Sequence, residues 1–218
     1  MTKHLLRDLE HLKKELLGVG SLVESAIDLA TTSLLERRPE LAKTVIQGDE
    51  EIDSREVAIE EDCLKTLALH QPVAYDLRYI IAVLKVNNDL ERMGDLAVNI
   101  AERAIYLSSR APLPEPPGFD RMVESVRRMV RTSLNALVQQ DIMLADEVLR
   151  ADDTVDAIHR QIFETTQERM RQNPDGIDHG LCMISASRNL ERIADQATNI
   201  AEDVLFLVKG EIIRHQKP

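Results

Sequence analysis

Two nearly identical stretches run through this chain one hundred positions apart: DLERMGDLAVNIAE at residues 89–102 and NLERIADQATNIAE at residues 189–202. The similarity continues outward, because Leu22–Ala26 matches Met122–Val126 and residues 45–53 match residues 148–156. Self-similarity over about half of a chain indicates a tandem duplication. The duplication has kept polar positions as faithfully as apolar ones, which suggests that the polar residues do more than support packing.

The composition favours an all-helical protein and excludes several functional classes. The 218 residues include 3% aromatic residues, no Trp, and few alternating β-branched stretches, which favours helices over sheets. A net charge of −11 repels nucleic acid and anionic lipid, so we expect no nucleic-acid partner. The longest apolar run, residues 79–84, is far shorter than the ~20 residues that span a bilayer, so no membrane insertion is expected.

The N-terminal stretch and the cysteines bear on the cellular compartment. The first residues alternate charged and apolar side chains without an apolar signal core, so we expect a cytoplasmic protein. Cys63 and Cys182 occupy unmatched places in the two copies. This placement argues against a disulfide framework and against a thiolate metal site, and it predicts two ordinary core residues.

Sparse Pro and Gly punctuation divides the chain into six long segments with helical periodicity. Residues 111–118 (APLPEPPG) are too proline-rich for a helix. We therefore predict three regions, namely a first three-helix repeat at 1–110, a linker at 111–118 and a second three-helix repeat at 119–218. Because very short turns force consecutive helices to run antiparallel, each repeat is predicted to be an up-down-up bundle. The predicted helices are 3–37, 39–69, 73–109, 119–139, 141–172 and 178–214.

A stripe of acids lies on the third helix of each predicted repeat. At 100° per residue, Glu91, Asp95, Asn99 and Glu102 fall within a sector of roughly 80°. Met93, Ala97, Ile100 and Ala104 lie on the opposite side, where the core is expected. Taken alone, this pattern is typical of a solvated helix face. Leu77, Ile81 and Leu84, however, occupy the same stripe upstream, so the acids interrupt an otherwise apolar seam.

The second helix of each repeat adds a further acidic pair, four residues apart and therefore on one face. Crowded carboxylates repel one another by ~4 kcal/mol per close pair at an effective dielectric of 20, unless protonation, a base or a metal neutralises them. All-oxygen ligand sets suit hard cations such as Mg²⁺, Mn²⁺ or Ca²⁺, or iron held by carboxylates. The sequence therefore predicts one metal site per repeat, with these candidate ligands: Asp49, Asp53, Glu91, Asp95 and Asn99 in the first, and Asp152, Asp156, Glu191, Asp195 and Asn199 in the second.

The doubled pattern Leu-Glu-Arg-x-x-Asp-x-x-x-Asn-Ile-Ala-Glu, together with Asp76-Leu-Arg-Tyr-Ile80, resembles the PhoU family of phosphate-specific transport regulators. The resemblance covers nearly the whole chain. It implies a pair of three-helix bundles related by an internal two-fold, with multinuclear metal clusters on the acid-x-x-x-Asp motifs. One departure is Gln196, at a position where relatives often carry His.

What the resemblance implies about function goes beyond what the residues show. Members of the family are negative regulators that silence a sensor histidine kinase and restrain phosphate uptake when phosphate is plentiful. The resemblance thus implies a non-enzymatic, cytoplasmic regulator whose partners are that kinase and the ATPase subunit of the phosphate transporter, and we expect a homodimer. The implied cofactors are metal ions, iron or zinc, or else manganese or magnesium.

Two alternatives remain open from the sequence. One is a carboxylate-bridged di-metal oxidoreductase of ferritin-like type, although such bundles take ligands from Glu-x-x-His pairs and this sequence has none. The other is a helical scaffold whose acids bind no metal. No phosphate-binding Gly-rich loop, nucleophile motif or zinc-type spacing occurs, so no catalytic residue is predicted.

Overall fold

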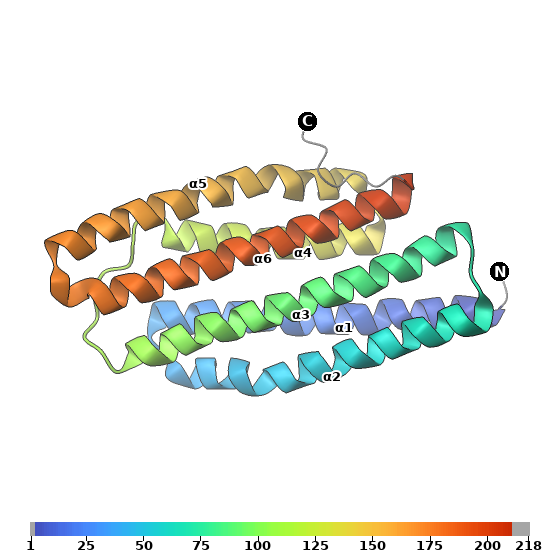
Figure 1. The fold of residues 1–218 in the computed structure, drawn as a ribbon, viewed down its shortest axis with the longest axis horizontal. Coiled ribbons are helices and arrows are strands. Elements are labelled where there is room, and N and C mark those ends of the chain that lie inside the picture. Colours follow the sequence, from blue (N-terminus) through green and yellow to red (C-terminus); the bar gives the residue numbers. More distant parts are fainter. Residues whose placement is uncertain (1–2, 211–218) are drawn as a thin grey trace.

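The computed structural model describes residues 3–210 and is helical throughout this range apart from turns and the linker (Figure 1). It contains six long helices and one short 3₁₀ turn, η1, at Pro174–Gly176. The long helices are α1 Lys3–Glu36, α2 Pro39–His70, α3 Ala74–Ser108, α4 Phe119–Gln139, α5 Ile142–Gln172 and α6 Ile177–Lys209.

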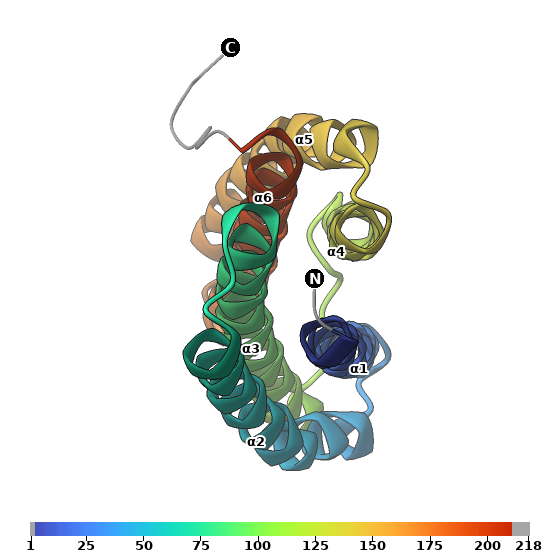
Figure 2. The same cartoon turned by 90° about the vertical axis from the view of Figure 1, so that its right-hand side faces the viewer.

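The helices form two antiparallel three-helix bundles, α1–α3 and α4–α6, that pack against each other along α3 and α6. Figure 2 shows that α2, α3, α6 and α5 make one curved layer, with α1 and α4 on its concave side. The predicted all-α class with two tandem up-down-up bundles is confirmed. Because α3 contacts α6 as extensively as it contacts α1 or α2, the two repeats share one continuous core.

The first helix shows how the sequence specifies this arrangement. Its apolar residues recur at three- and four-residue spacing, which lines one face of a helix, and that face is buried from Leu5 to Leu34. Gly20 lies inside this helix without ending it. A Cβ at Gly20 would come within 3.1 Å of Leu134 on α4, so the missing side chain permits the close crossing of α1 and α4.

The predicted helix bounds agree with the structure to within one residue, with one exception. The last helix was predicted to extend to residue 214, but α6 ends at Lys209, because Gly210 takes the left-handed conformation (φ 75°) that caps helices. Residues 211–214 lie outside the described part of the chain. At the other boundaries, Pro39 begins α2 and the Asp141 carboxylate accepts hydrogen bonds from the first amides of α5.

The two repeats differ most in the length of their first helix. α1 has 34 residues and α4 has 21. The second repeat has no counterpart of the N-terminal half of α1, and the linker that precedes α4 lies in that place (Figure 1). Leu113, Pro114 and Pro116 of the linker line a cavity against the α5–α6 turn. Cys63 and Cys182 are buried and free, as predicted. None of the helices within residues 3–210 combines the length and apolar character needed to cross a membrane.

Candidate metal sites

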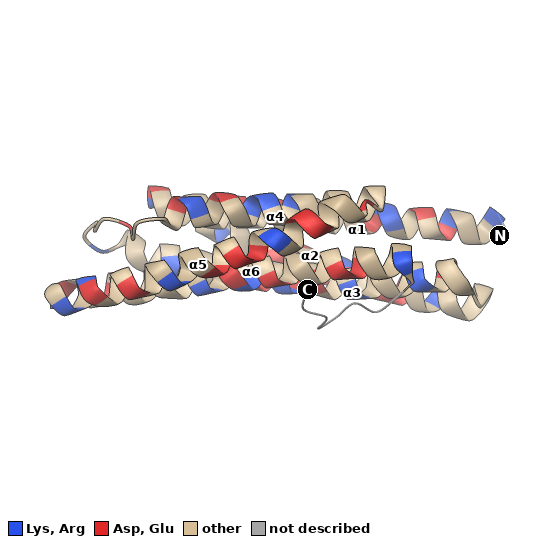
Figure 3. Cartoon of the chain, turned by 90° about the horizontal axis from the view of Figure 1, so that it is seen from above, with Lys and Arg blue, Asp and Glu red and all other residues tan. Residues whose placement is uncertain are grey.

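The predicted acids lie in two equivalent seams between neighbouring antiparallel helices. We call Asp49, Asp53, Glu91 and Asp95 the first acidic seam, and Asp152, Asp156, Glu191 and Asp195 the second acidic seam. In each seam one pair comes from the second helix of the repeat and the other pair from the third. The four acids of each seam influence one another's ionisation across the two helices. In the view of Figure 3, acidic segments of α5 and α6 lie side by side.

The local sequence brings the two helices of the first seam close together. On α3, the side opposite the acids is formed by Met93, Ala97 and Ile100, which are fully buried and anchor the helix in the core. Gly94 lies on the side that faces α2, and a Cβ there would be 3.3 Å from a carboxylate oxygen of Asp49. The absence of a side chain at Gly94 therefore allows the Asp49 carboxylate to approach the backbone of α3.

Burial and mutual repulsion perturb the carboxylates of the first seam. The pKa of Asp49 is raised by burial and by the charges of Asp53 and Asp95. The pKa of Glu91 is raised by burial, then by Asp95, Asp53 and Glu56, while Arg92 acts weakly in the opposite direction. Each of these groups would be stabilised by a nearby positive charge.

The second seam is perturbed more strongly. Burial, followed by the charges of Asp156 and Asp195, raises the pKa of Asp152 to about 6. Burial, followed by Glu191 and Asp156, raises the pKa of Asp195 to about 6, against a small opposing effect of Arg192. Burial and Asp156 also raise the pKa of Glu191. One carboxylate oxygen of Asp152 is buried and has no hydrogen-bond partner among residues 3–210.

The carboxylates of both seams lack protein partners within the described chain. None of the eight forms an ion pair or a side-chain hydrogen bond with another residue of 3–210. Arg55, close in sequence to the first seam, pairs instead with Glu51. The seams thus concentrate negative charge that Arg92, Arg188 and Arg192 offset only in part. Their donor set consists of carboxylate oxygens, which hard cations prefer.

The carboxylates do not form a closed ligand set. Within residues 3–210, no three His, Cys, Asp or Glu side chains are arranged so that one ion would contact them together. The structure therefore brings the predicted acids into common seams but leaves their role as metal ligands a prediction. The unpartnered Asp152 oxygen and the oxygen-only donors are the features that fit a cation.

The predicted asparagine of the second site, Asn199, differs from the carboxylates because it contacts the other repeat. The Asn199 amide donates to the Asp89 carboxylate on α3, with 3.5 Å between the atoms. Asn99 and Asn199 are both partly buried. Asn199 therefore helps to join the two repeats, and its role as a ligand remains a prediction.

Two residues beside the seams were not among the predicted ligands. Glu56 follows Asp53 by three residues, and its charge acts on Glu91. The three-residue spacing from Asp53 to Glu56 puts both acids on one face of α2, and this spacing could have identified Glu56 from the sequence. His159 holds the equivalent place in the second repeat, where its Nδ1 lies 3.1 Å from the Ser187 hydroxyl. His159 is partly buried, and this burial lowers the pKa of its imidazole.

The sequence matches a known family model twice. The PhoU domain matches residues 16–104 and again residues 119–204. A relative from Aquifex aeolicus is 42% identical over 212 residues, which are 97% of this chain and 96% of the relative. A relative from Pseudomonas putida is 40% identical and covers 95% of this chain and 82% of its own length. Both relatives are named phosphate-specific transport system accessory protein PhoU homolog.

Solved structures show the same fold. The crystal structure of PhoU from Pseudomonas aeruginosa superposes with a TM-score of 0.90 at 37% identity, over 94% of this chain and 99% of that one. The phosphate transport system regulatory protein PhoU from Streptococcus pneumoniae gives a TM-score of 0.85 at 28% identity, over 95% and 98% of the two chains. Both the sequence and the arrangement of helices show that this chain belongs to the PhoU family.

Proposed function

We propose that this chain is a cytoplasmic, non-enzymatic regulator of phosphate homeostasis. The relatives are named as accessory proteins of a phosphate-specific transport system, and the names describe no catalytic activity. Within this role, the chain restrains phosphate uptake and phosphate-starvation signalling by contact with the transporter's ATPase subunit and with a sensor histidine kinase. It acts as a homodimer.

The observation that carries the metal part of this proposal is the pair of equivalent acidic seams, whose carboxylates form no ion pair or side-chain hydrogen bond with other residues of 3–210. Their oxygen donors fit iron, manganese or magnesium, and zinc also accepts carboxylate ligands. Asp49, Asp53, Glu91 and Asp95 would hold one site, and Asp152, Asp156, Glu191 and Asp195 the other. A bound cation supplies positive charge that offsets the repulsion between the carboxylates. The carboxylates of each seam would then hold their two helices at a fixed spacing and so fix the surface that partners contact.

Elemental analysis tests the metal part directly. The protein is purified without chelator beside a Glu91→Ala/Glu191→Ala variant and a control, Glu60→Ala/Glu164→Ala, which removes exposed glutamates from α2 and α5. We expect metal in the wild type and in the control, and its loss from the seam variant. Equal metal content in all three proteins would contradict the assignment.

Partner binding is tested separately. Immobilised wild-type protein, metal-free protein and the Glu91→Ala/Glu191→Ala variant are each presented with the transporter ATPase subunit and with the kinase's cytoplasmic portion. We expect binding by the wild type and weaker binding by the other two. Full binding by metal-free protein would separate the regulatory role from the metal. The same preparations, analysed by sedimentation, report the oligomeric state.

The two alternatives make different predictions. A ferritin-like oxidoreductase would show metal-dependent turnover of oxygen or peroxide, and no residue pattern in this chain favours it. A metal-free scaffold would show no change in melting temperature when a chelator is added, whereas metal held by the folded state raises that temperature.

A further inference from the structure

A cavity in the second repeat lies between the linker and the α5–α6 turn, and we call it the linker cavity. It encloses about 320 Å³, which is large enough for a small molecule. Leu113, Pro114 and Pro116 give it an apolar wall, while Arg169 and His179 line it from α5 and α6. The described residues around it include no Asp or Glu, although the chain as a whole carries a net charge of −11.

A buried hydroxyl in the linker cavity has no partner. Thr166 lines the cavity and is 3% exposed, and its Oγ1 accepts or donates no hydrogen bond within residues 3–210. Threonines inside helices commonly donate to the carbonyl four residues earlier, as Thr31 and Thr66 do over 2.7 Å. An unbonded buried hydroxyl costs free energy, so a polar ligand in the cavity would stabilise it.

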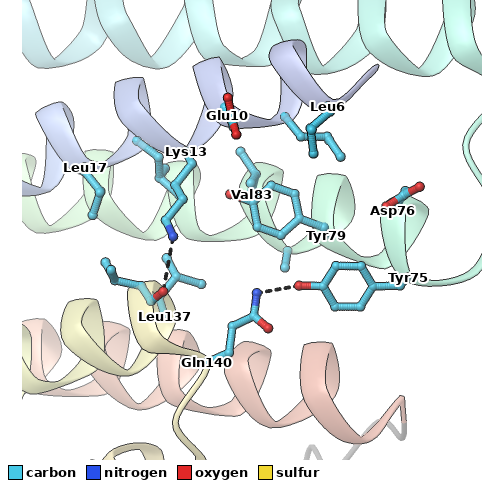
Figure 4. Close-up of a pocket in the computed structure, with 14 residues that line it drawn as sticks. Leu6, Glu10, Lys13, Leu17, Tyr75, Asp76, Tyr79, Val83, Leu137 and Gln140 are labelled. Atoms are coloured by element: carbon cyan, nitrogen blue, oxygen red, sulfur yellow. Dashed lines mark hydrogen bonds between the residues drawn. The ribbon is translucent and has the colours of Figure 1, made fainter. Parts of the chain in front are cut away.

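The duplication shows that these donors are specific to the second repeat. In the alignment of the two copies, Cys63 is the counterpart of Thr166, and Tyr79 is the counterpart of His179. Cys63 is fully buried, and Tyr79 lies in an apolar groove that Leu6 and other residues of the N-terminal half of α1 line (Figure 4). The second repeat has no such half-helix, and it carries a hydroxyl and an imidazole at these two positions.

Two guanidinium groups make the linker cavity electropositive. Burial lowers the pKa of His179, and the charges of Arg37 and Arg169 lower it further, so both guanidiniums lie near this imidazole. The Arg169 guanidinium donates to the carbonyls of Pro114 and Glu115, over 3.1 and 2.9 Å. These two bonds hold Arg169 against the linker, at the edge of the cavity.

The nearby acids do not neutralise this charge. Asp175 and Asp178 line a neighbouring cavity. Asp178 pairs with Arg110, with 3.5 Å between the charged atoms, and accepts a hydrogen bond from the Tyr106 hydroxyl over 3.0 Å. Asp175 is exposed and forms no ion pair with a described residue. The linker cavity therefore favours an anionic ligand.

We infer that the linker cavity binds a small molecule through a phosphoryl group. Arg169, His179 and the Thr166 hydroxyl supply donors from two helices, and a phosphoryl group offers three acceptor oxygens to them where a carboxylate offers two. An organic phosphate also covers the apolar wall of the linker, whereas inorganic phosphate offers the same group without that contact. The cavity shares no lining residue with either acidic seam, so this binding is separate from metal in the seams.

Calorimetric titration of the full chain tests the class of ligand, with phenyl phosphate, inorganic phosphate and benzoate as probes. Benzoate keeps the ring of phenyl phosphate and replaces the phosphoryl group by a carboxylate. We expect phenyl phosphate to bind about tenfold more tightly than either of the others. Equal binding of the two phosphates, both tighter than benzoate, would support the phosphoryl site and assign free phosphate as its ligand. Tighter binding of benzoate, or no binding of either phosphate, would overturn the proposal.

Substitutions test the position of the site. Arg169→Gln and Thr166→Val each remove one donor, and Arg171→Gln is the control, because it removes an exposed guanidinium that pairs with Glu168 in the same last turn of α5. We expect phenyl phosphate to bind about tenfold more weakly to Arg169→Gln, several-fold more weakly to Thr166→Val, and as in the wild type to Arg171→Gln.

Thermal unfolding of the unliganded proteins is measured first. Because the Thr166 hydroxyl has no partner, Thr166→Val should melt at the temperature of the wild type, so this variant tests the site even if Arg169→Gln disturbs the linker. All the variants keep the acidic seams, so phosphate held by metal there would bind to each of them equally. Affinity that is unchanged in folded Arg169→Gln and Thr166→Val proteins would overturn the proposal and leave the proposed metal sites untouched.

Discussion

The carboxylates of the acidic seams are the residues whose chemistry departs most from that of a solvated helix face. Acids at i, i+4 on exposed helices usually find a base or face water. Here burial raises the pKa of Asp49, Glu91, Asp152, Glu191 and Asp195, and the neighbouring acids raise it further. At neutral pH the metal-free protein therefore folds against the repulsion of these side chains.

The first prediction concerns the pH dependence of the metal-free protein. The pKa of Asp152 and of Asp195 is about 6 in the folded state, against 3.8 for an unperturbed aspartate. Between these values the folded state binds more protons than the unfolded state, so the free energy of unfolding falls as the pH rises from about 4 to 6. We expect the protein to be more stable at pH 5 than at pH 7, by on the order of 1 kcal/mol after solvent screening. Urea unfolding in the presence of chelator measures this difference.

An Asp152→Asn variant tests whether the Asp152 carboxylate causes this pH dependence. Asp152→Asn removes one charge from the second seam, so it should stabilise the metal-free protein at pH 7 and reduce the pH dependence. The same variant should bind less metal. An Asp152→Asn protein that is less stable than the wild type at pH 7 would show that the carboxylate stabilises the fold by itself.

The second prediction concerns the buried charge between the repeats. The Lys85 ammonium lies 2.9 Å from a carboxylate oxygen of Asp203, whose side chain is 2% exposed, and 5.1 Å above the centre of the Phe206 ring. Lys85→Ala removes the ammonium from beside a buried carboxylate, so we expect a loss of about 1–3 kcal/mol of stability. Lys85→Met/Asp203→Leu, which removes both charges, should recover much of that loss. Urea unfolding of the two variants measures both values, and equal losses would contradict the assignment to the ion pair.

At the scale of the helices, glycines mark where the elements approach each other. Gly20 lies at the crossing of α1 and α4, and Gly94 lies where α2 meets α3. Gly48 is different, because no atom lies within 4 Å of the place of its Cβ. Close packing therefore requires glycine at positions 20 and 94, whereas position 48 has room for a side chain.

The third prediction follows from that difference. Gly48→Ala should raise the free energy of unfolding by about 1 kcal/mol, because alanine favours the helical backbone and nothing obstructs its methyl group. Gly20→Leu should lower it by ~1–3 kcal/mol, because the added side chain would overpack the contact with Leu134. Denaturant unfolding with an unchanged m-value is the measurement. A stabilising Gly20→Leu would show that the α1–α4 crossing is not close-packed.

For the whole molecule, the interface between α3 and α6 determines cooperativity. The repeats are joined there by a continuous apolar core together with the Lys85–Asp203 and Asn199–Asp89 contacts. A duplicated chain with a small interface would unfold repeat by repeat, whereas a shared core couples the two.

The fourth prediction is that residues of both repeats unfold in one transition. Differential scanning calorimetry should give a calorimetric enthalpy equal to the van't Hoff enthalpy for the metal-free protein. Lys85→Ala should lower the single melting temperature rather than split the transition. Two separated transitions would mean that each bundle is stable without the other.

The sequence by itself determined the duplication, the all-α class and the helix bounds, because these depend on local periodicity and on Pro and Gly at the turns. It also placed the four acids of each seam on common helix faces, since spacing along one helix fixes direction. The sequence also predicted that the acids of the second and third helices of each repeat share one site. Only the tertiary structure decided that the repeats meet along α3 and α6, added Glu56 to the first seam, and turned Asn199 towards Asp89 in the other repeat. These contacts depend on the crossing of distant segments, which no local pattern encodes.

The end of α6 at Gly210 was missed because glycine is also tolerated inside helices, as Gly20 is. Only the backbone angles distinguish the two glycines.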